Sequence, residues 1–313
     1  MFPPSLVLAA VAAGIVPGAA LLASARWPHR SPGAAIVLWQ ALGLSWGLAA
    51  VGALAGLGAV RGRDGVAGGA LASAALAVRA EVAGPAAPSL VVVARLVFLT
   101  AGTALLALLC WVLMAASADV VLARRRHRTL LSLLAHGDPK VPGALVVDYP
   151  AAAVYCVPGL RSQIVISAGT LDLLDQAELA AVLAHERAHV RARHDLVLLP
   201  FGALVRAFPR SQLVRRAHTT VALLVEMLAD DQALRHRHAR ELATALLRVG
   251  VSGARATPSG ALAAVAASDG EVSARVARLL APGPRLPMPA QALVCAASAL
   301  IVAVPVALLV LTF

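Results

Sequence analysis

This chain contains four long uncharged stretches and one long polar region. The uncharged runs cover residues 2–25, 31–60, 96–118 and 286–313. Each run can supply the roughly twenty apolar helical residues that cross the hydrocarbon core of a bilayer. We therefore predict transmembrane helices at about 5–25, 34–60, 94–117 and 288–313. The polar region at 123–287 is predicted to be a separate domain inserted between the third and fourth spans.

A fifth apolar stretch, Leu196 to Phe208, is shorter and is interrupted by Pro200 and Arg206. Its length favours a buried or interface-lying helix over a membrane crossing. The composition agrees with a membrane protein, because 60% of the residues are hydrophobic and only 14% are charged, far from the balance of soluble domains.

Two short β-type segments open the polar domain. Ala153–Val157 and Gln163–Ser167 are rich in β-branched or alternating apolar residues and flank Pro158-Gly159, which predicts strand, turn and strand. We expect the second segment, Gln163–Ser167, to be an edge strand. An edge strand beside a catalytic helix can hold an extended substrate by β-addition.

The sequence His185-Glu186-Arg187-Ala188-His189 follows in a segment with helical character. Asp175-Gln176-Ala177-Glu178 has the form of a capping box, and an apolar stripe comes after it. Residues four apart share one face of a helix, so His185 and His189 can bind one Zn²⁺ ion while Glu186 acts as general base. The alternative is a surface helix whose histidines and glutamate are merely solvated.

A catalytic zinc ion needs a third protein ligand. Glu226 is the leading candidate, because it lies within an apolar helical run where a carboxylate is costly unless it meets a metal or a cation. A salt bridge to an arginine is the alternative role for Glu226. Asp195 and His194 remain alternative ligands, although their spacing departs from the metzincin pattern. Asp230, four residues after Glu226, is placed to support a ligating histidine from behind.

Arginines suggest an orientation for the spans. Arg26 and Arg30 follow the first span and a cluster at 124–128 follows the third, whereas fewer arginines follow the second. The positive-inside rule then places the polar domain in the cytoplasm and both termini outside. The net charge of +11 favours contact with anionic membrane lipids, and no nucleic-acid recognition motif accompanies it, so no direct nucleic-acid partner is expected.

These residues together resemble the BlaR/MecR-type membrane metallopeptidases, particularly the short actinobacterial forms. The resemblance covers nearly the whole chain, and its specific motifs are the following: Tyr155-Cys-Val-Pro-Gly159, Ile164-Val-Ile-Ser-Ala-Gly169, His185-Glu-Arg-Ala-His189 and Glu226-Met-Leu-Ala-Asp230. It implies a mainly α membrane protein in which a gluzincin-like α+β zinc peptidase domain is inserted among four transmembrane helices. By this resemblance His185, His189 and Glu226 bind zinc, Glu186 is the base and Asp230 supports the site.

The resemblance also implies a function. Family members in the bacterial inner membrane cleave a cytosolic winged-helix repressor of the BlaI/MecI type in response to an envelope signal. The antibiotic-sensing members carry a penicillin-binding domain with a Ser-x-x-Lys motif, but the only lysine here, Lys140, follows Gly137 by three residues. Two other functions remain open: an HtpX-like quality-control protease with the same zinc site, and a non-catalytic membrane scaffold.

Overall fold

A computed structural model describes residues 3–59, 90–139, 141–159, 162–251 and 269–312. The arginines after the second predicted span, Arg61, Arg63 and Arg79, lie outside the described residues. Within the described ranges, four helices are long and apolar enough to cross a membrane, and they occur where the sequence predicts them. They are α1 (Pro4–Ser24), α2 (Pro32–Gly58), α4 (Leu90–Leu134) and α11 (Met288–Thr312).

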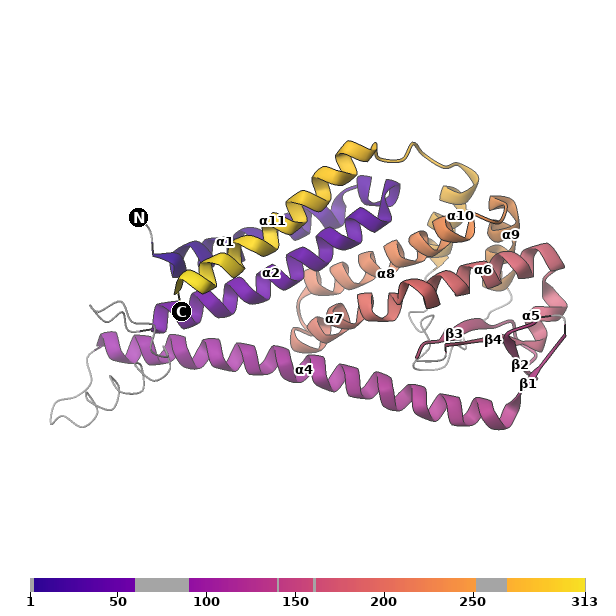
Figure 1. The fold of residues 1–313 in the computed structure, drawn as a ribbon, viewed down its shortest axis with the longest axis horizontal. Helices are drawn as coiled ribbons and strands as arrows, with labels where there is room; N and C mark the ends of the chain where they lie inside the picture. The colour runs from indigo at the N-terminus through magenta and orange to yellow at the C-terminus, as the bar shows by residue number, and fades with distance from the viewer. Residues whose placement is uncertain (1–2, 60–89, 140, 160–161, 252–268, 313) are drawn as a thin grey trace.

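The α1, α2 and α11 helices pack together, and α4 runs along the other side of the molecule (Figure 1). Both termini lie at the end of the molecule that is distant from the sheet. The short turn η1 (Trp27–Arg30) between α1 and α2 lies at the opposite end, where Arg30 Nε donates to Pro284 O at 2.7 Å and Arg278 Nε donates to His29 O at 2.9 Å. The loop after the first span is therefore on the same side as the polar domain.

The α4 helix has 45 residues and continues without a break past the predicted domain boundary at 122/123. Its last turns belong to the polar domain. His127 Nε2 lies 2.9 Å from the Tyr155 hydroxyl, and Leu131 is buried against the sheet. One helix thus joins the apolar bundle to the sheet.

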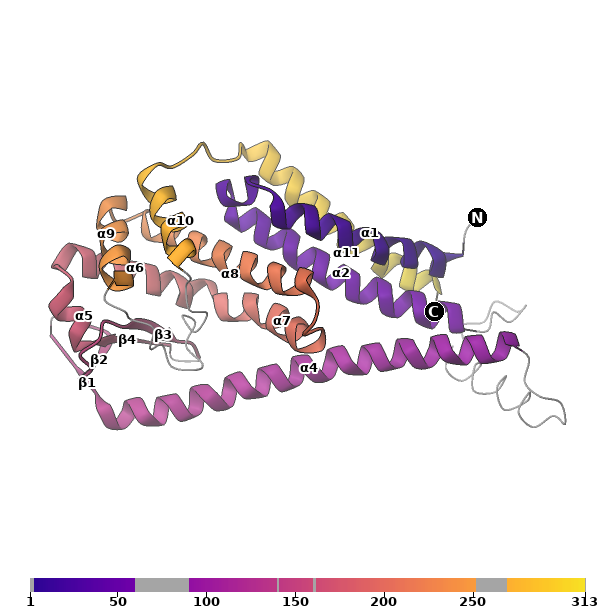
Figure 2. The same ribbon diagram turned by 180° about the vertical axis from the view of Figure 1, so that it is seen from behind.

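The sheet has four short strands in the order β1-β2-β4-β3 (Figure 2). These are β1 (Ala135–Gly137), β2 (Ala144–Val147), β3 (Val154–Val157) and β4 (Gln163–Ser167). The predicted strand pair is confirmed as antiparallel β3 and β4. The predicted edge position is wrong, because β4 pairs with β2 as well as with β3. The edge strands are β1 and β3. The sequence alone does not reveal that β2 pairs in parallel with β4.

Alternation along the strands gives the sheet two covered faces. Ile164, Ile166 and Cys156 point toward α6 (Gln176–Ala192), whereas Val165 and Val157 pack with Leu131 of α4. Successive side chains of a strand point to opposite faces, so the apolar sequence of β4 follows from burial on both sides.

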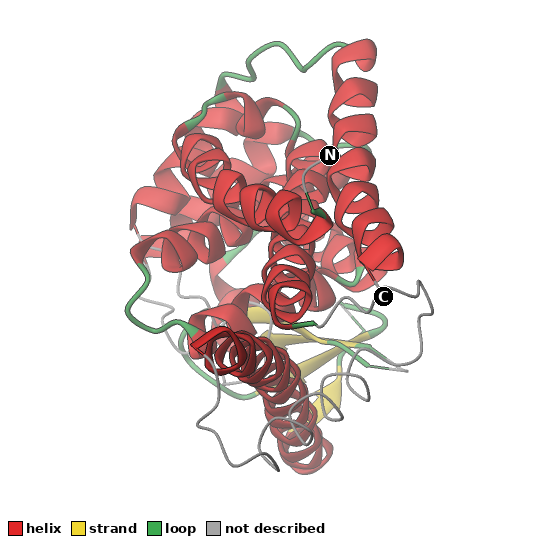
Figure 3. Cartoon of the chain, turned by 90° about the vertical axis from the view of Figure 1, so that its left-hand side faces the viewer, coloured by secondary structure: helices red, strands yellow, loops and turns green. Residues whose placement is uncertain are grey.

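The remaining helices complete the domain, which consists mostly of helices beside the small sheet (Figure 3). They are α5 (Ala168–Leu173), α7 (His194–Ala207), α8 (Gln212–Ala233), α9 (Ala239–Val251) and α10 (Asp269–Leu280). In Figure 1, α7 and α8 lie between α2 and α4, whereas α5, α9 and α10 lie at the end of the molecule far from the termini. The fifth apolar stretch is α7, which is not among the four helices long enough to span. Val221, Leu224 and Val225 of α8 pack with Trp39 of α2, so the domain shares a core with the spans.

Candidate metal centre

The predicted capping box starts the helix that carries the histidine motif. Asp175 accepts hydrogen bonds from the backbone N–H groups of Ala177 and Glu178, and Glu178 accepts one from Asp175 N–H. Such a box satisfies N–H groups that a helix start leaves without partners. It fixes the start of α6, so His185, Glu186 and His189 lie in its second half, all buried.

Helix α8 contributes the carboxylates. Its apolar face packs on the spans, which leaves Glu226 and Asp230 on the face toward α6. Asp230 is fully buried, and the Glu226 side chain is 29% exposed. The carboxylates of α8 therefore meet the histidines of α6 where the two helices pack.

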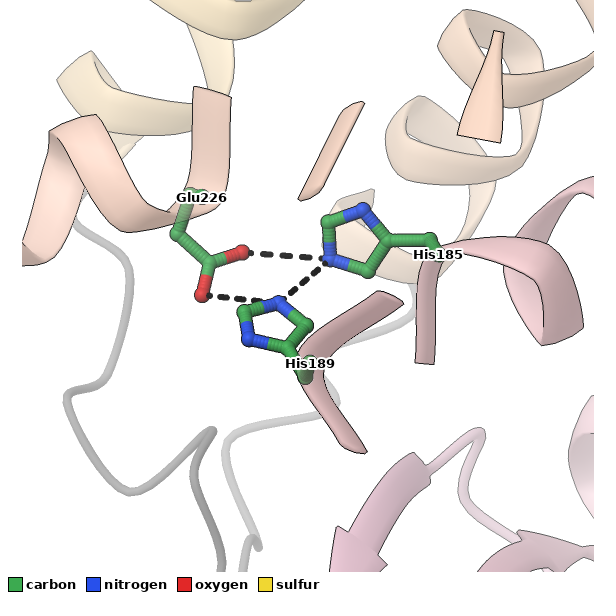
Figure 4. A group of neighbouring side chains, drawn as sticks. All are labelled: His185, His189 and Glu226. Atoms are coloured by element: carbon green, nitrogen blue, oxygen red, sulfur yellow. Dashed lines mark hydrogen bonds and ion pairs between the residues drawn. The ribbon is translucent and has the colours of Figure 1, made fainter. Parts of the chain in front are cut away.

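His185, His189 and Glu226 converge on one point, as Figure 4 shows. The two Nε2 atoms are 3.0 Å apart, and Glu226 oxygens lie 3.3 Å from His185 Nε2 and 3.5 Å from His189 Nε2. Two ligands that bind one tetrahedral zinc ion are separated by roughly 3.3 Å. Two imidazoles and one carboxylate also form a donor set of catalytic zinc sites. The residues therefore fit a zinc ion.

Behind this group, Asp230 and Arg275 hold the side chains in place. Asp230 Oδ1 lies 2.9 Å from His185 Nδ1, the nitrogen that faces away from the convergence point. Arg275, from α10, donates to both oxygens of Asp230 at 2.7 and 2.9 Å, and its Nη1 lies 2.9 Å from Glu226 Oε2. Arg275 is itself buried, so this cation balances two carboxylates away from solvent.

The charges shift the pKa values of the metal-free centre. Burial lowers the pKa of His185, but contacts with Asp230 and Glu226 outweigh it and raise the pKa to about 9. Burial raises the pKa of both carboxylates, yet their cationic neighbours prevail: the pKa of Asp230 falls to about 2 and that of Glu226 lies well below its usual value. Arg275 is a leading cause in both cases. The carboxylates are thus ionised, as metal binding requires.

His189 is supported by a second imidazole. Its Nδ1 lies 3.0 Å from the Nδ1 of His194, which is 1% exposed. A positive φ of 50° at Arg193 turns the chain sharply between α6 and α7 and brings His194 back against His189. Burial and the nearby His189 lower the pKa of His194 to about 3, so its ring is neutral and can accept the Nδ1 proton of His189.

The predicted base, Glu186, faces the sheet. The Cys156 thiol of β3 donates a hydrogen bond to its carboxylate. Burial raises the pKa of Glu186, and the histidines of the motif oppose that effect. A raised pKa suits a carboxylate that accepts and then returns a proton. Burial also raises the pKa of Cys156 above its ordinary value, so this thiol is neutral.

The other predicted ligands lie apart from the convergence point. Asp195 is paired with Arg124 of α4 at 3.0 Å, and His194 contacts the far side of His189. Among the described residues, no other group of three histidines, cysteines or acidic residues could hold a metal ion. The ligand, base and support roles predicted for these residues stay predictions. The sequence does not separate Arg275 from the other arginines, and it assigns no role to Cys156 within its motif, because each contacts the centre from a distant element.

A comparison with protein families matches residues 122–274, just under half of the chain, to peptidase family M48. This match supports an M48 family metallopeptidase, and peptidases of this family are metal-dependent, usually with zinc. It does not bear out the BlaR/MecR type. No curated protein and no solved structure matches the chain. Arg275 directly follows the matched segment.

Proposed function

We propose that this chain is a membrane zinc endopeptidase that hydrolyses peptide bonds by promoted attack of water. The observation that carries the proposal is the convergence of His185, His189 and Glu226 beside the buried carboxylate of Glu186. The family match agrees with it. A non-catalytic scaffold would have no use for three ionisable groups held by buried charges that cost folding free energy unless they are paired.

Each residue has a distinct role in the proposed reaction. His185, His189 and Glu226 would hold the zinc ion, while Asp230 and His194 orient the two imidazoles through their Nδ1 atoms. A bound zinc ion supplies Lewis acidity that activates water and polarises the scissile carbonyl. Glu186 takes the proton of the attacking water and returns it to the leaving amine. Arg275 keeps Glu226 ionised and oriented.

The sheet edge offers a place for the substrate backbone. One of the two edge strands is β3, and its Cys156 contacts Glu186, so this strand runs next to the base. An extended peptide that pairs with β3 would pass beside Glu186. We propose β-addition at β3, which favours flexible segments over folded cores as substrates.

For the physiological substrate we propose a cytosolic winged-helix repressor of the BlaI/MecI type, supported by the motif resemblance. Cleavage between the DNA-binding and dimerisation parts would leave a monomeric DNA-binding half that loses the affinity of two linked half-sites. Quality control of membrane proteins, as in an HtpX-like protease, is the competing proposal. The match to peptidase family M48 is compatible with this alternative and does not depend on the repressor resemblance.

We also propose that the domain lies on the cytoplasmic side of a bacterial inner membrane. The loop of Arg26 and Arg30 and the arginines at 124–128 both lie on the domain side, as the positive-inside rule requires for a cytoplasmic domain. A reporter that is active only in the cytoplasm should work when fused after Arg128 and fail when fused after Phe313. The reverse pattern would place the domain outside.

Metal analysis with matched variants tests the chemistry. The purified full chain should contain about one zinc ion and cleave an unstructured protein, and Glu186→Gln should keep the zinc and lose cleavage because only the base is removed. Glu226→Ala should lose most of the metal, whereas Asp195→Ala should retain it. A zinc content that is equal in the wild type and in Glu226→Ala would refute the ligand assignment. A metal-free wild type would favour the scaffold.

Co-expression tests the substrate. The wild-type chain together with its companion repressor should yield a repressor fragment and derepression under an envelope stimulus, and Glu186→Gln should yield neither. An intact repressor, combined with accumulation of misfolded membrane proteins in the Glu186→Gln strain, would establish the quality-control function instead.

A further inference from the structure

A cavity of about 680 Å³ lies among the apolar helices, away from the metal centre. Helices α2, α4, α7 and α11 form its walls. Along α2 it extends from Val37 to Val51, and on α11 it extends from Cys295 to Leu309. Fourteen residues of helix correspond to about 21 Å. The cavity is therefore long and follows the direction of the spans.

The lining is almost entirely apolar. Its two largest polar side chains already have backbone partners, because Gln40 Nε2 donates to Val197 O at 2.8 Å and the Ser298 hydroxyl donates to Val294 O at 2.8 Å. Among the residues that the structure describes, no charged side chain lines the cavity. A ligand that needs several hydrogen bonds would leave its polar groups unsatisfied in this environment, at a cost of several kcal/mol. The lining therefore favours a ligand made of hydrocarbon.

The dimensions favour a ligand that is narrower than a helix. A volume of 680 Å³ spread over the length of the cavity gives a mean cross-section of roughly 30 Å². A helix with its side chains is about 10–12 Å wide and needs roughly 80–110 Å². An extended peptide would be narrow enough, but its backbone N–H and C=O groups would find no partners among these residues. A single flexible hydrocarbon chain meets both requirements.

The cavity also reaches the outside of the helix bundle. Leu44 of α2 and Leu106 and Leu113 of α4 line it, and these side chains are 42–55% exposed. In a membrane that outer surface faces lipid tails. We propose that this cavity binds one acyl chain of a bilayer phospholipid, which enters from the side between the spans.

The bound chain would lie directly against α7. Pro200, Phe201 and Leu204 of α7 line the cavity, and the same helix begins at His194, which supports His189. The site is thus adjacent to the metal centre in the chain but chemically independent of it. The proposal requires that the apolar helices lie in a membrane and does not require peptidase activity.

A pair of glycine substitutions tests the proposal. Gly43 lines the cavity, and a Cβ atom added there would meet no atom within 4 Å, so Gly43→Leu fills the space without a backbone clash. Gly14 of α1 is also without neighbours within 4 Å but is exposed outside the cavity, so Gly14→Leu is the matched control. Ala299→Leu fills the cavity from the facing helix α11.

The full chain and the variants are reconstituted in phosphatidylcholine vesicles, extracted into detergent and washed, and the phospholipid that remains per chain is counted by mass spectrometry. The wild type and Gly14→Leu should retain about one more phospholipid than Gly43→Leu and Ala299→Leu, as expected for one filled ligand pocket. Thermal melting identifies a variant that fails to fold. If Gly43→Leu or Ala299→Leu fails to fold, the phospholipid content of the other one decides the test. Equal phospholipid in all four proteins overturns the proposal. So does a case in which Gly43→Leu blocks cleavage of membrane-anchored substrates while its lipid content is unchanged, since the cavity would then receive substrate.

Discussion

The metal centre and the bundle of apolar helices are held together by different interactions. In the centre, buried charges select their partners: Arg275 binds Asp230 through two hydrogen bonds, and Asp230 contacts His185. In the bundle, helices meet where small residues allow it. Gly58 of α2 lies so close to α4 that an added Cβ atom would be 2.8 Å from the Arg95 carbonyl oxygen.

Charge therefore determines which residues meet in the metal centre, whereas shape determines how the helices of the bundle pack. A buried charged side chain must meet a side chain of opposite charge, because leaving it unpaired costs several kcal/mol. Apolar helices lack that selectivity, and lipid tails are as apolar as their side chains, so close approach of small residues determines how they pack. Where α2, α4 and α11 do not approach closely, the cavity lies between them.

The largest effect should come from removing the cation of the metal centre. Arg275→Met leaves Glu226 and Asp230 buried without their counter-charge, and loss of one partner of a buried pair costs about 3–5 kcal/mol. Arg206→Met is the control, because the Arg206–Asp119 pair is roughly half exposed and such pairs contribute at most about 1 kcal/mol. Thermal melting of the metal-free proteins in detergent measures both. Equal melting temperatures would show that Arg275 does not stabilise the centre.

Next in size is the support of His189. His194→Phe keeps a ring in the buried space but removes the nitrogen that accepts the Nδ1 proton of His189, and loss of such a support lowers metal affinity about 10- to 100-fold. Competition with a chromogenic chelator measures the zinc affinity. His218→Phe, in α8 and outside the convergence point, should leave that affinity unchanged. A normal affinity in His194→Phe would mean that His189 is oriented by packing alone.

In the bundle, stability should depend on how closely the helices fit together and not on charge. Gly58→Ala forces α2 and α4 apart, which should cost about 1–3 kcal/mol, as overpacking does. Gly43→Ala adds the same methyl group in open space and should change stability by less than about 1 kcal/mol. Thermal melting of the two variants gives the comparison. If Gly43→Ala were the more damaging substitution, helix contact would not limit the packing of the bundle.

The last effect concerns pH. The pKa of His185 is about 9 in the folded metal-free protein and near 6.5 when unfolded, so its contribution to stability is complete below pH 6.5 and is lost as the pH rises through about 9. The stability of the metal-free protein should fall by about 3 kcal/mol across that window, because each unit of pKa shift corresponds to about 1.4 kcal/mol. The zinc-loaded protein should show no such fall, because its histidines are already deprotonated. Melting curves from pH 6.5 to 9.5, with chelator and with zinc, distinguish the two.

The sequence predicts the parts of this molecule whose signals are local. The four apolar helices, the capping box at Asp175 and the pairing of β3 with β4 follow from composition and spacing. Glu226 was singled out because a carboxylate in an apolar helix needs a partner. Contacts between distant elements leave no such trace, and for that reason the edge position of β3 and the role of Arg275 emerge only from the structure.

The unbroken α4 helix connects a candidate membrane span directly to the sheet. From residue 118 to its end at Leu134, this helix projects about 24 Å beyond its apolar part, and Leu131 and His127 fasten its tip to the sheet. Transmembrane helices adjust their tilt to the thickness of the surrounding membrane. For a lever of this length, a change of about 10° moves the tip by about 4 Å. If α4 crosses a membrane, a change in membrane thickness would displace the end of α4 that contacts the sheet.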